Sequence, residues 1–232
     1  MRTIMISDIH GCLDELNALL HAVEYSPVRD KLVLLGDYVD RGPKSKEVVE
    51  QIMQLVNEHG AIAIKGNHDQ RLADLIHNRD VKEKFIEHGG LETITSYTNS
   101  KDFTLEEAME FIRDNYFDHI HFLSSLPLYY EDQDHIYVHA GINPSVADWR
   151  LTSKHDFLYI KELFIRNKTT VKDRKIVFGH TKTIDIHGTP DVWFSDDKIG
   201  IDGGCAYGLQ LNALIFNGTK YENFSIKKAN IV

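Results

Sequence analysis

Asp37, Asp40 and Arg41 lie close together in the segment KLVLLGDYVDRGPKS (residues 31–45), directly after an apolar run and between two glycines. An ordinary surface turn needs a glycine or a proline and at most one aspartate. Two carboxylates and a guanidinium at the end of a buried strand can instead bind a cation and an anion at one site. The segment is therefore either an acidic surface turn or part of a site that binds both kinds of ion.

Similar polar clusters follow two other apolar runs, as SDIHG after the first run and GNHD after the third. Asp8 and His10 can share one target if the strand continues through them, because side chains two apart on a strand point the same way. Asn67 follows the third run as Asp37 follows the second. Ligands bind at the carboxyl ends of parallel strands, so we expect these side chains to lie together.

Two later apolar runs end in histidine, with His139 in IYVHAG and His180 in IVFGHT. The combined set holds two carboxylates, three imidazoles and one amide. Oxygen and imidazole donors together suit divalent ions such as manganese, iron or zinc, and suit calcium poorly. Six donors are too many for one catalytic ion that keeps open positions, so two ions sharing a carboxylate fit the set better.

The elements that must position these residues alternate between β and α in the first part of the chain. The patterns predict strands over 3–7, 31–35 and 61–65, and helices over 13–23, 45–59 and 69–78. Three β-then-α units predict a parallel core sheet. The region 80–126 is predicted to be helical and to flank the sheet. From residue 128 onward, short apolar runs broken by turn residues predict further strands, several of them antiparallel, interrupted by a helix over 154–168.

Composition limits the classes of protein that fit. With 232 residues, 42% hydrophobic and 26% charged, the chain suits one large domain over residues 1–232. A net charge of −9 disfavours a nucleic-acid partner. Two cysteines give no disulfide framework and suit a reducing compartment. No apolar stretch is long enough for a membrane span and no signal peptide is visible, so we expect a cytoplasmic protein without a membrane partner. Nothing in the composition indicates an oligomeric state.

The motifs DIHG, GDYVDRGP, GNHD, HAG and GHT, in this order, closely resemble the calcineurin-like metallophosphoesterases. Within them the chain is most similar to the phosphoprotein phosphatase branch, bacterial and phage forms included. GDYVDRGP together with GNHD is highly specific, whereas HAG or GHT alone is weak. The resemblance runs from about residue 3 to residue 216. It implies an α/β fold, a four-layer α/β/β/α sandwich in which mixed central sheets are flanked by helices, with a dinuclear metal centre at its mouth.

The resemblance also implies a role for each motif residue. It implies that Asp37 bridges two divalent ions, manganese in the first place and iron or zinc as alternatives, and that a bridging hydroxide attacks phosphorus. His68 becomes the general acid, oriented by Asp40, while Arg41 and Asn67 bind phosphate. The metal ligands implied are Asp8, His10, Asp37, Asn67, His139 and His180.

The chain departs from the pattern of this family at its second phosphate-binding arginine. The best counterpart is LYIKELF, with Lys161 in place of the arginine and Tyr159 in place of a tryptophan. Lysine supplies charge but no planar fork, so we expect weaker phosphate binding. Arg150 or Arg166 are the alternatives. Tyr207, in DGGCAYG, is a further candidate for contact with substrate.

Two activities fit this reading, both metal-dependent hydrolysis of phosphoesters. The first is a serine/threonine protein phosphatase acting on phosphorylated proteins or small phosphoesters, which the compact length favours. The alternative is a symmetrical diadenosine tetraphosphate hydrolase. A non-catalytic scaffold is disfavoured because all the motif residues are present, and GDYVDRGP disfavours a cyclic-nucleotide diesterase. The other histidines are expected to be surface or structural residues: His21, His59, His77, His88, His119, His121, His135, His155 and His187.

Overall fold

The computed structural model of the protein describes residues 1–229. Two five-stranded mixed sheets face each other, with strand orders β10-β9-β1-β2-β3 and β4-β5-β6-β8-β7. The strands are β1 (Arg2–Ile6), β2 (Asp30–Leu34), β3 (Ile62–Ala63), β4 (Tyr129–Glu131), β5 (His135–Val138), β6 (Lys175–Phe178), β7 (Trp193–Phe194), β8 (Lys198–Gly200), β9 (Gln210–Phe216) and β10 (Tyr221–Lys227).

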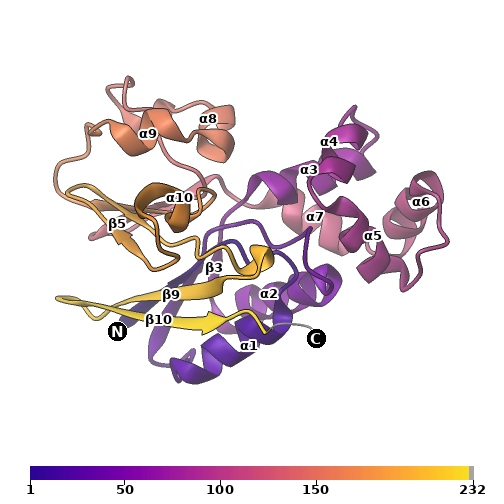
Figure 1. Ribbon diagram of the computed structural model, residues 1–232, viewed down its shortest axis with the longest axis horizontal. Coiled ribbons are helices and arrows are strands. Elements are labelled where there is room, and N and C mark those ends of the chain that lie inside the picture. The colour runs from indigo at the N-terminus through magenta and orange to yellow at the C-terminus, as the bar shows by residue number, and fades with distance from the viewer. Residues whose placement is uncertain (230–232) are drawn as a thin grey trace.

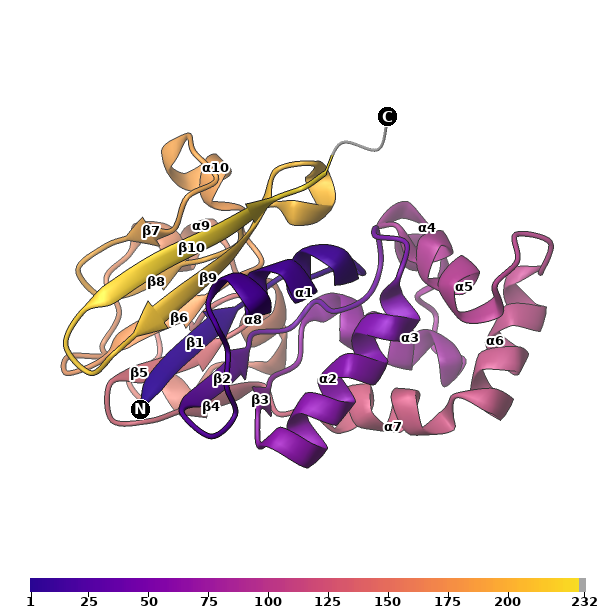
Figure 2. The same cartoon turned by 90° about the horizontal axis from the view of Figure 1, so that it is seen from below.

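Helices cover the outer faces of both sheets, as Figure 1 shows. The helices are α1 (Leu13–Ala22), α2 (Ser45–His59), α3 (Asn67–Ile76), α4 (Lys82–Glu87), α5 (Gly90–Thr98), α6 (Leu105–Asn115), α7 (Phe117–Ser125), α8 (Lys154–Tyr159), α9 (Glu162–Arg166) and α10 (Thr183–His187), with short 3₁₀ turns at Trp149–Leu151 and Cys205–Tyr207. In the view of Figure 2, α4, α5 and α6 lie on the side away from the second sheet. The expected four-layer α/β sandwich is therefore confirmed.

The strand period of two explains the layers. On β1, Ile4 and Ile6 pack against α1 and α2, whereas Met5 points between the sheets. On β5, Tyr137 points into the same inter-sheet layer, and Ile136 packs toward α8 and α9. Each central strand is thus buried on both faces. This burial explains why these segments are continuous apolar runs in the sequence.

The parallel pairing predicted for the first part of the chain is confirmed, since β1 pairs with β2 and β2 with β3 in parallel. In the second part, β4–β5, β7–β8 and β9–β10 are antiparallel, but β5–β6 and β6–β8 are parallel. Strand β10 was not predicted, because most of its side chains are exposed and polar. In the described residues 1–229, no helix combines the length and apolar character needed to cross a membrane.

The helix predicted over 154–168 is wrong in one respect, because it breaks into α8 and α9. Ile160 takes an extended conformation, with φ −62° and ψ 139°. Its side chain is buried and lies so near the Gly141 backbone that a β-carbon there would crowd it. Burial of Ile160 therefore overrides the local helical pattern, and the break exposes Lys161.

Candidate active site

The first group of predicted metal ligands lies in sharp turns after β1 and β2. β1 ends at Ile6, and Asp8, His10 and Asp37 have left-handed φ values of 53°, 46° and 57°. The idea that strand alternation aligns Asp8 with His10 is therefore wrong. The turns nevertheless bring them together, since His10 Nε2 lies 4.0 Å from Asp8 Oδ1 and 3.5 Å from Asp37 Oδ2. Strained backbone conformations of this kind are retained where contacts with the surrounding structure hold them in place.

The second group approaches Asp37 from the other sheet. His139 Nε2 lies 3.4 Å from Asp37 Oδ2 and 2.9 Å from Asn67 Oδ1. The ring centroids of His139 and His180 are 5.1 Å apart. Two triads of closely spaced donor atoms, His10–Asp37–His68 and Asp37–His139–His180, share Asp37, and His68 in the first triad is the predicted general acid and not one of the six predicted ligands. The structure brings all six predicted ligands to one place, with Asp37 at the centre.

The imidazoles are oriented as metal ligands are. His10 Nδ1–H donates to the Val39 carbonyl at 2.7 Å, and His139 Nδ1–H donates to the Leu35 carbonyl at 2.9 Å. Such bonds set the tautomer and direct Nε2 into the site. His180 Nε2 is buried and has no hydrogen-bond partner among residues 1–229. Most buried polar atoms have a partner, so a ligand such as a metal ion fits this ring nitrogen.

The charges of the site also fit divalent cations. Burial, only partly offset by His139, raises the pKa of Asp8 to about 6. Burial disfavours the imidazolium of His139, but the carboxylates of Asp37 and Asp8 outweigh it and raise its pKa to about 9. Buried carboxylates facing imidazoles are costly without a strong counter-charge. The donor types, the shared Asp37 and the unpartnered His180 nitrogen together fit a pair of divalent ions.

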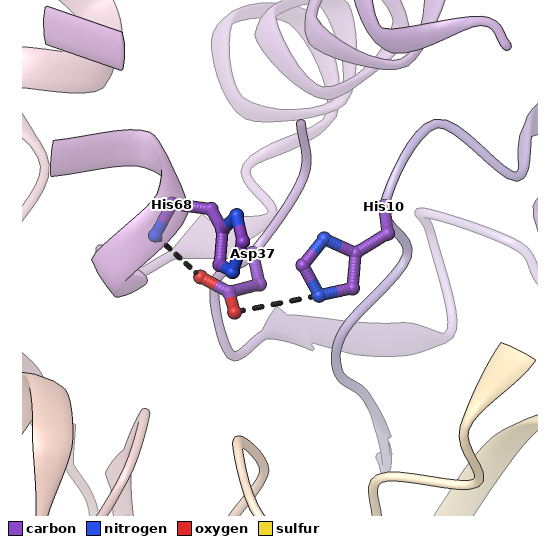
Figure 3. A group of neighbouring side chains, drawn as sticks. All are labelled: His10, Asp37 and His68. Carbon is purple, nitrogen blue, oxygen red and sulfur yellow. Dashed lines mark hydrogen bonds and ion pairs between the residues drawn. The ribbon is translucent and has the colours of Figure 1, made fainter. Parts of the chain in front are cut away.

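His68 is the second residue of α3 and lies beside this group, and Figure 3 shows its backbone N–H directed at the Asp37 carboxylate. His68 Nδ1 lies 2.6 Å from Asp40 Oδ2, and Asp40 also accepts a hydrogen bond from Thr93 at 2.7 Å. Arg41 contacts the Nε2 atoms of both His68, at 2.8 Å, and His10. The arrangement of a histidine held by a buried carboxylate is the one expected for a general acid.

Asp69 holds two of these turns together, although no role was predicted for it. Its carboxylate accepts hydrogen bonds from the backbone N–H groups of Asp37 and Tyr38, both at 2.9 Å, and of Gly66 at 2.8 Å. A β-carbon at Gly66 would clash with the backbone nitrogen and the carboxylate of Asp37. Asp69 is the last residue of GNHD, so its place in the motif was the available signal.

A cleft of about 310 Å³ opens beside the metal-binding group. It contains Lys161, which the helix break carries there, but not the alternatives Arg150 and Arg166, which pair with Glu131 and Glu162. The charged and aromatic residues that line it are Asp8, Asp37, Arg41, His68, Arg71, His88, Tyr159, Lys161, Glu162, His180, Lys182, Asp185, Asp202 and Tyr207.

Several cleft residues, His88, Arg71 and Lys182 among them, were not predicted, whereas Tyr207 was. His88 was expected to be a surface or structural residue, but it lines the cleft. Tyr207, a candidate for substrate contact, is 53% exposed, with the Arg41 guanidinium carbon 4.9 Å and Lys182 Nζ 4.6 Å from its ring centroid. Arg71 comes from α3, and Lys182 follows the GHT motif. The sequence shows that Arg71 and Lys182 are cationic, but it does not distinguish them from lysines and arginines that are exposed to solvent.

A second cluster of possible metal-binding groups lies outside the cleft. Cys12, Glu15 and Cys205 gather there, all buried. Lys228 Nζ lies 3.6 Å from Cys12 Sγ and 3.0 Å from Glu15 Oε2. The cluster thus already holds its cation, so its geometry does not require a metal.

Comparison with known proteins agrees with this geometry. The family profile described as Calcineurin-like phosphoesterase matches residues 1–193. The asymmetrical bis(5'-nucleosyl)-tetraphosphatase PrpE of Oceanobacillus iheyensis is 30% identical, and the match covers 93% of this chain and 89% of that protein. A symmetrical bis(5'-nucleosyl)-tetraphosphatase of Haemophilus influenzae is 34% identical over 65% of this chain, but the match spans only 47% of that relative.

Two solved structures share the fold. A putative diadenosine tetraphosphatase superposes with a TM-score of 0.67 at 24% identity, and the match covers 99% of this chain and 94% of the other. A protein serine/threonine phosphatase from Saccharomyces cerevisiae, with similarity to human phosphatase PP5, has a TM-score of 0.66 at 14% identity and coverages of 99% and 81%. At these identities the likeness extends to the fold alone.

Proposed function

The chain belongs to the calcineurin-like phosphoesterases, and from this premise we propose that it is a metal-dependent hydrolase of dinucleoside tetraphosphates. One observation carries the proposal. The cleft beside the metal-binding group contains four cationic side chains, Arg41, Arg71, Lys161 and Lys182. A single phosphoryl group needs fewer, whereas a chain of phosphates presents an anionic oxygen to each.

The relatives support this order of preference. The sequence alone favoured a protein phosphatase because the chain is compact. The asymmetrical tetraphosphatase of Oceanobacillus iheyensis aligns with this chain over 89% of its own length, so compactness does not separate the two activities. The match also points to asymmetrical cleavage, rather than to the symmetrical cleavage that the sequence offered as the alternative activity.

The residues divide the work of hydrolysis among them. Asp8, His10, Asp37, Asn67, His139 and His180 would hold two divalent ions, which supply an activated water at neutral pH and offset negative charge when bound. We place manganese first among the candidates, with iron and zinc as alternatives.

The groups around the reacting phosphate act through charge and proton transfer. Arg41 and the amide of Asn67 bind the phosphoryl oxygens and stabilise the charge that develops on them. His68, held by Asp40 through its Nδ1 atom, donates a proton to the leaving oxygen. Lys161 adds charge at the edge of the cleft.

One observation favours a second activity, hydrolysis of phosphoserine or phosphothreonine. The His68–Asp40 pair is fully buried and well aligned, with 2.6 Å between Nδ1 and Oδ2. A serine alkoxide is a poor leaving group that needs protonation, whereas a nucleotide leaves readily without it. An intact general acid is therefore more useful for phosphoproteins than for phosphoanhydrides.

Parallel kinetics separate the two activities. We would measure kcat/KM for diadenosine tetraphosphate and for a phosphoserine peptide with manganese, and identify the nucleotide products by anion-exchange chromatography. The proposal expects preference for the dinucleotide by orders of magnitude, with a triphosphate and a monophosphate as products. Two diphosphates would show symmetrical cleavage, and preference for the peptide would replace the first activity with the second.

A further inference from the structure

Arg71 is a buried cation in the wall of the cleft. It lies on α3 three residues after His68, so both side chains emerge from one face of the helix. Only 5% of Arg71 is exposed, and that part faces the cleft. Its Nη1 atom approaches His68 Nδ1 to 3.5 Å, and the Tyr159 hydroxyl lies beside its guanidinium.

No carboxylate in residues 1–229 lies within 4.0 Å of the Arg71 guanidinium, and the nearby acids have other partners. Asp74 pairs with Arg79 at 3.3 Å. Asp40 is held by His68 and Thr93, and the Asp69 carboxylate accepts three backbone N–H groups. A buried guanidinium without a counter-charge is unfavourable, because its lost hydration is not replaced.

Arg71 differs from the other arginines by its burial, because Arg29 and Arg113, which also have no carboxylate within 4.0 Å in residues 1–229, are exposed. Arg2 pairs with Asp30 at 2.9 Å, and Arg174 pairs with Glu131 at 2.6 Å. Arg41 is the other arginine of the cleft, and it too has no carboxylate within 4.0 Å among the described residues. The two cleft arginines flank the same imidazole, Arg41 at the Nε2 atom of His68 and Arg71 at its Nδ1 side.

We propose that Arg71 binds the phosphate on the leaving-group side of the bond that is cleaved. The step rests on the proposed role of His68, which must face the leaving oxygen to protonate it. A cation beyond that imidazole lies near the group that is bonded to the leaving oxygen. In a phosphoanhydride this group is the next phosphate. The planar guanidinium can bind two of its oxygens at once, which Lys161 cannot do. Arg71 thus determines specificity for polyphosphate over monoester substrates.

The test compares two inorganic inhibitors, orthophosphate and tripolyphosphate, in wild type and in Arg71→Met. Their inhibition constants are measured against p-nitrophenyl phosphate hydrolysis, with free manganese held constant. Arg71→Met should remove a charge-assisted hydrogen bond that tripolyphosphate makes and orthophosphate does not. We therefore expect the inhibition constant of tripolyphosphate to rise about tenfold or more relative to the inhibition constant of orthophosphate. Arg71→Lys, which keeps the charge but not the fork, should recover part of the difference.

Two further measurements separate binding from a structural role. Because Arg71→Met removes an unpaired buried charge, its melting temperature without phosphate should equal or exceed that of the wild type. Arg79→Met, a change of an exposed arginine just beyond the same helix, is the matched control and should leave both inhibition constants as they are.

Inhibition constants that rise in parallel for both anions, or a tripolyphosphate constant within twofold of the wild type, would overturn the assignment. Should Arg71→Met fail to fold, Arg71→Lys alone decides, since a ratio equal to that of the wild type again contradicts it. Preference for a phosphopeptide by the wild-type enzyme would refute the proposed substrate, but it would leave this ratio interpretable.

Discussion

The turns after β1, β2 and β3 hold their functional side chains in a different way from the segment between β5 and β6. In the first region, Asp37 and His68 are buried, the backbone N–H of His68 donates to the Asp37 carboxylate, and the backbone N–H of Asp37 donates to the Asp69 carboxylate. In the second, Lys161 is exposed at a helix break. The metal-binding turns are thus preorganised, whereas part of the substrate-binding surface is free to adapt. The side chains proposed to carry out the reaction are therefore held more rigidly than those proposed to bind the substrate.

Removing the shared carboxylate should break the first region most severely. Asp37→Ala takes a ligand from both triads, so we expect loss of both ions and of at least ~10³-fold in activity, since metal ions contribute several kcal/mol of transition-state stabilisation. Metal content per chain, measured by elemental analysis after dialysis, checks this. His180→Ala is the matched comparison, because it belongs to one triad and should release one ion. Retention of two ions by Asp37→Ala would contradict the shared site.

Replacing the general acid tests the chemistry of the same region without removing its metals. His68→Asn should keep its ions but lose ~10²–10⁴-fold in turnover of a phosphoserine peptide, because the alkoxide leaves unprotonated. The loss on p-nitrophenyl phosphate should be smaller, since p-nitrophenol is already acidic. Equal losses on the two substrates would show that His68 does not act as an acid.

The close packing of the turns can be tested at a single glycine. Gly66 has an ordinary φ of −96°, so Gly66→Ala adds only a steric clash with Asp37, which we expect to cost ~1–3 kcal/mol. Thermal unfolding measures this cost, and metal content should fall as well. Gly60→Ala is the control, because its position is left-handed but open, so it strains the backbone without touching the site. Full metal content in Gly66→Ala would show that the turns can move apart.

The smallest effect is expected in the second region. Lys161→Ala removes an exposed charge, so KM for a phosphoester should rise about two- to fivefold. Steady-state kinetics at low ionic strength check this, because salt screens the attraction between an exposed lysine and the phosphate and would hide the change in KM. Glu162→Ala, which removes the neighbouring acid from the cleft, should move KM in the opposite direction. If Lys161→Ala leaves KM and turnover unchanged, lysine does not stand in for the second arginine.

The contrast between the regions also explains what could be predicted. Asp8, Asp37, Asn67 and their neighbours were visible because each sits in a motif directly after an apolar run. Asp8 and His10 were expected to align through strand alternation, yet left-handed backbone at both residues brings them together, and turn conformation leaves a weak trace in residue type.

The unpredicted features depend on tertiary surroundings. The break at Ile160 follows from its burial near Gly141, although FLYIKELF has a helical pattern. Arg71 is notable for being buried with no carboxylate within 4.0 Å in the part of the chain that the structure describes, which is a property of its surroundings and not of its sequence position. Strand β10 is polar because it forms an edge of its sheet.

The order of strands in the first sheet has a consequence for synthesis of the chain. β1 is made first, yet one of its two partners is β9, with Ile4 opposite Ile215. While the ribosome is translating the intervening residues, one edge of β1 offers unpaired N–H and C=O groups to any neighbouring nascent strand. His139 and His180 are also translated long after β1, so the complete ligand set forms only once His180 has been made. Premature termination before His180 should therefore yield a product that lacks β9 and at least one predicted ligand, so we expect it to be prone to aggregation, to bind metal poorly and to depend on chaperones.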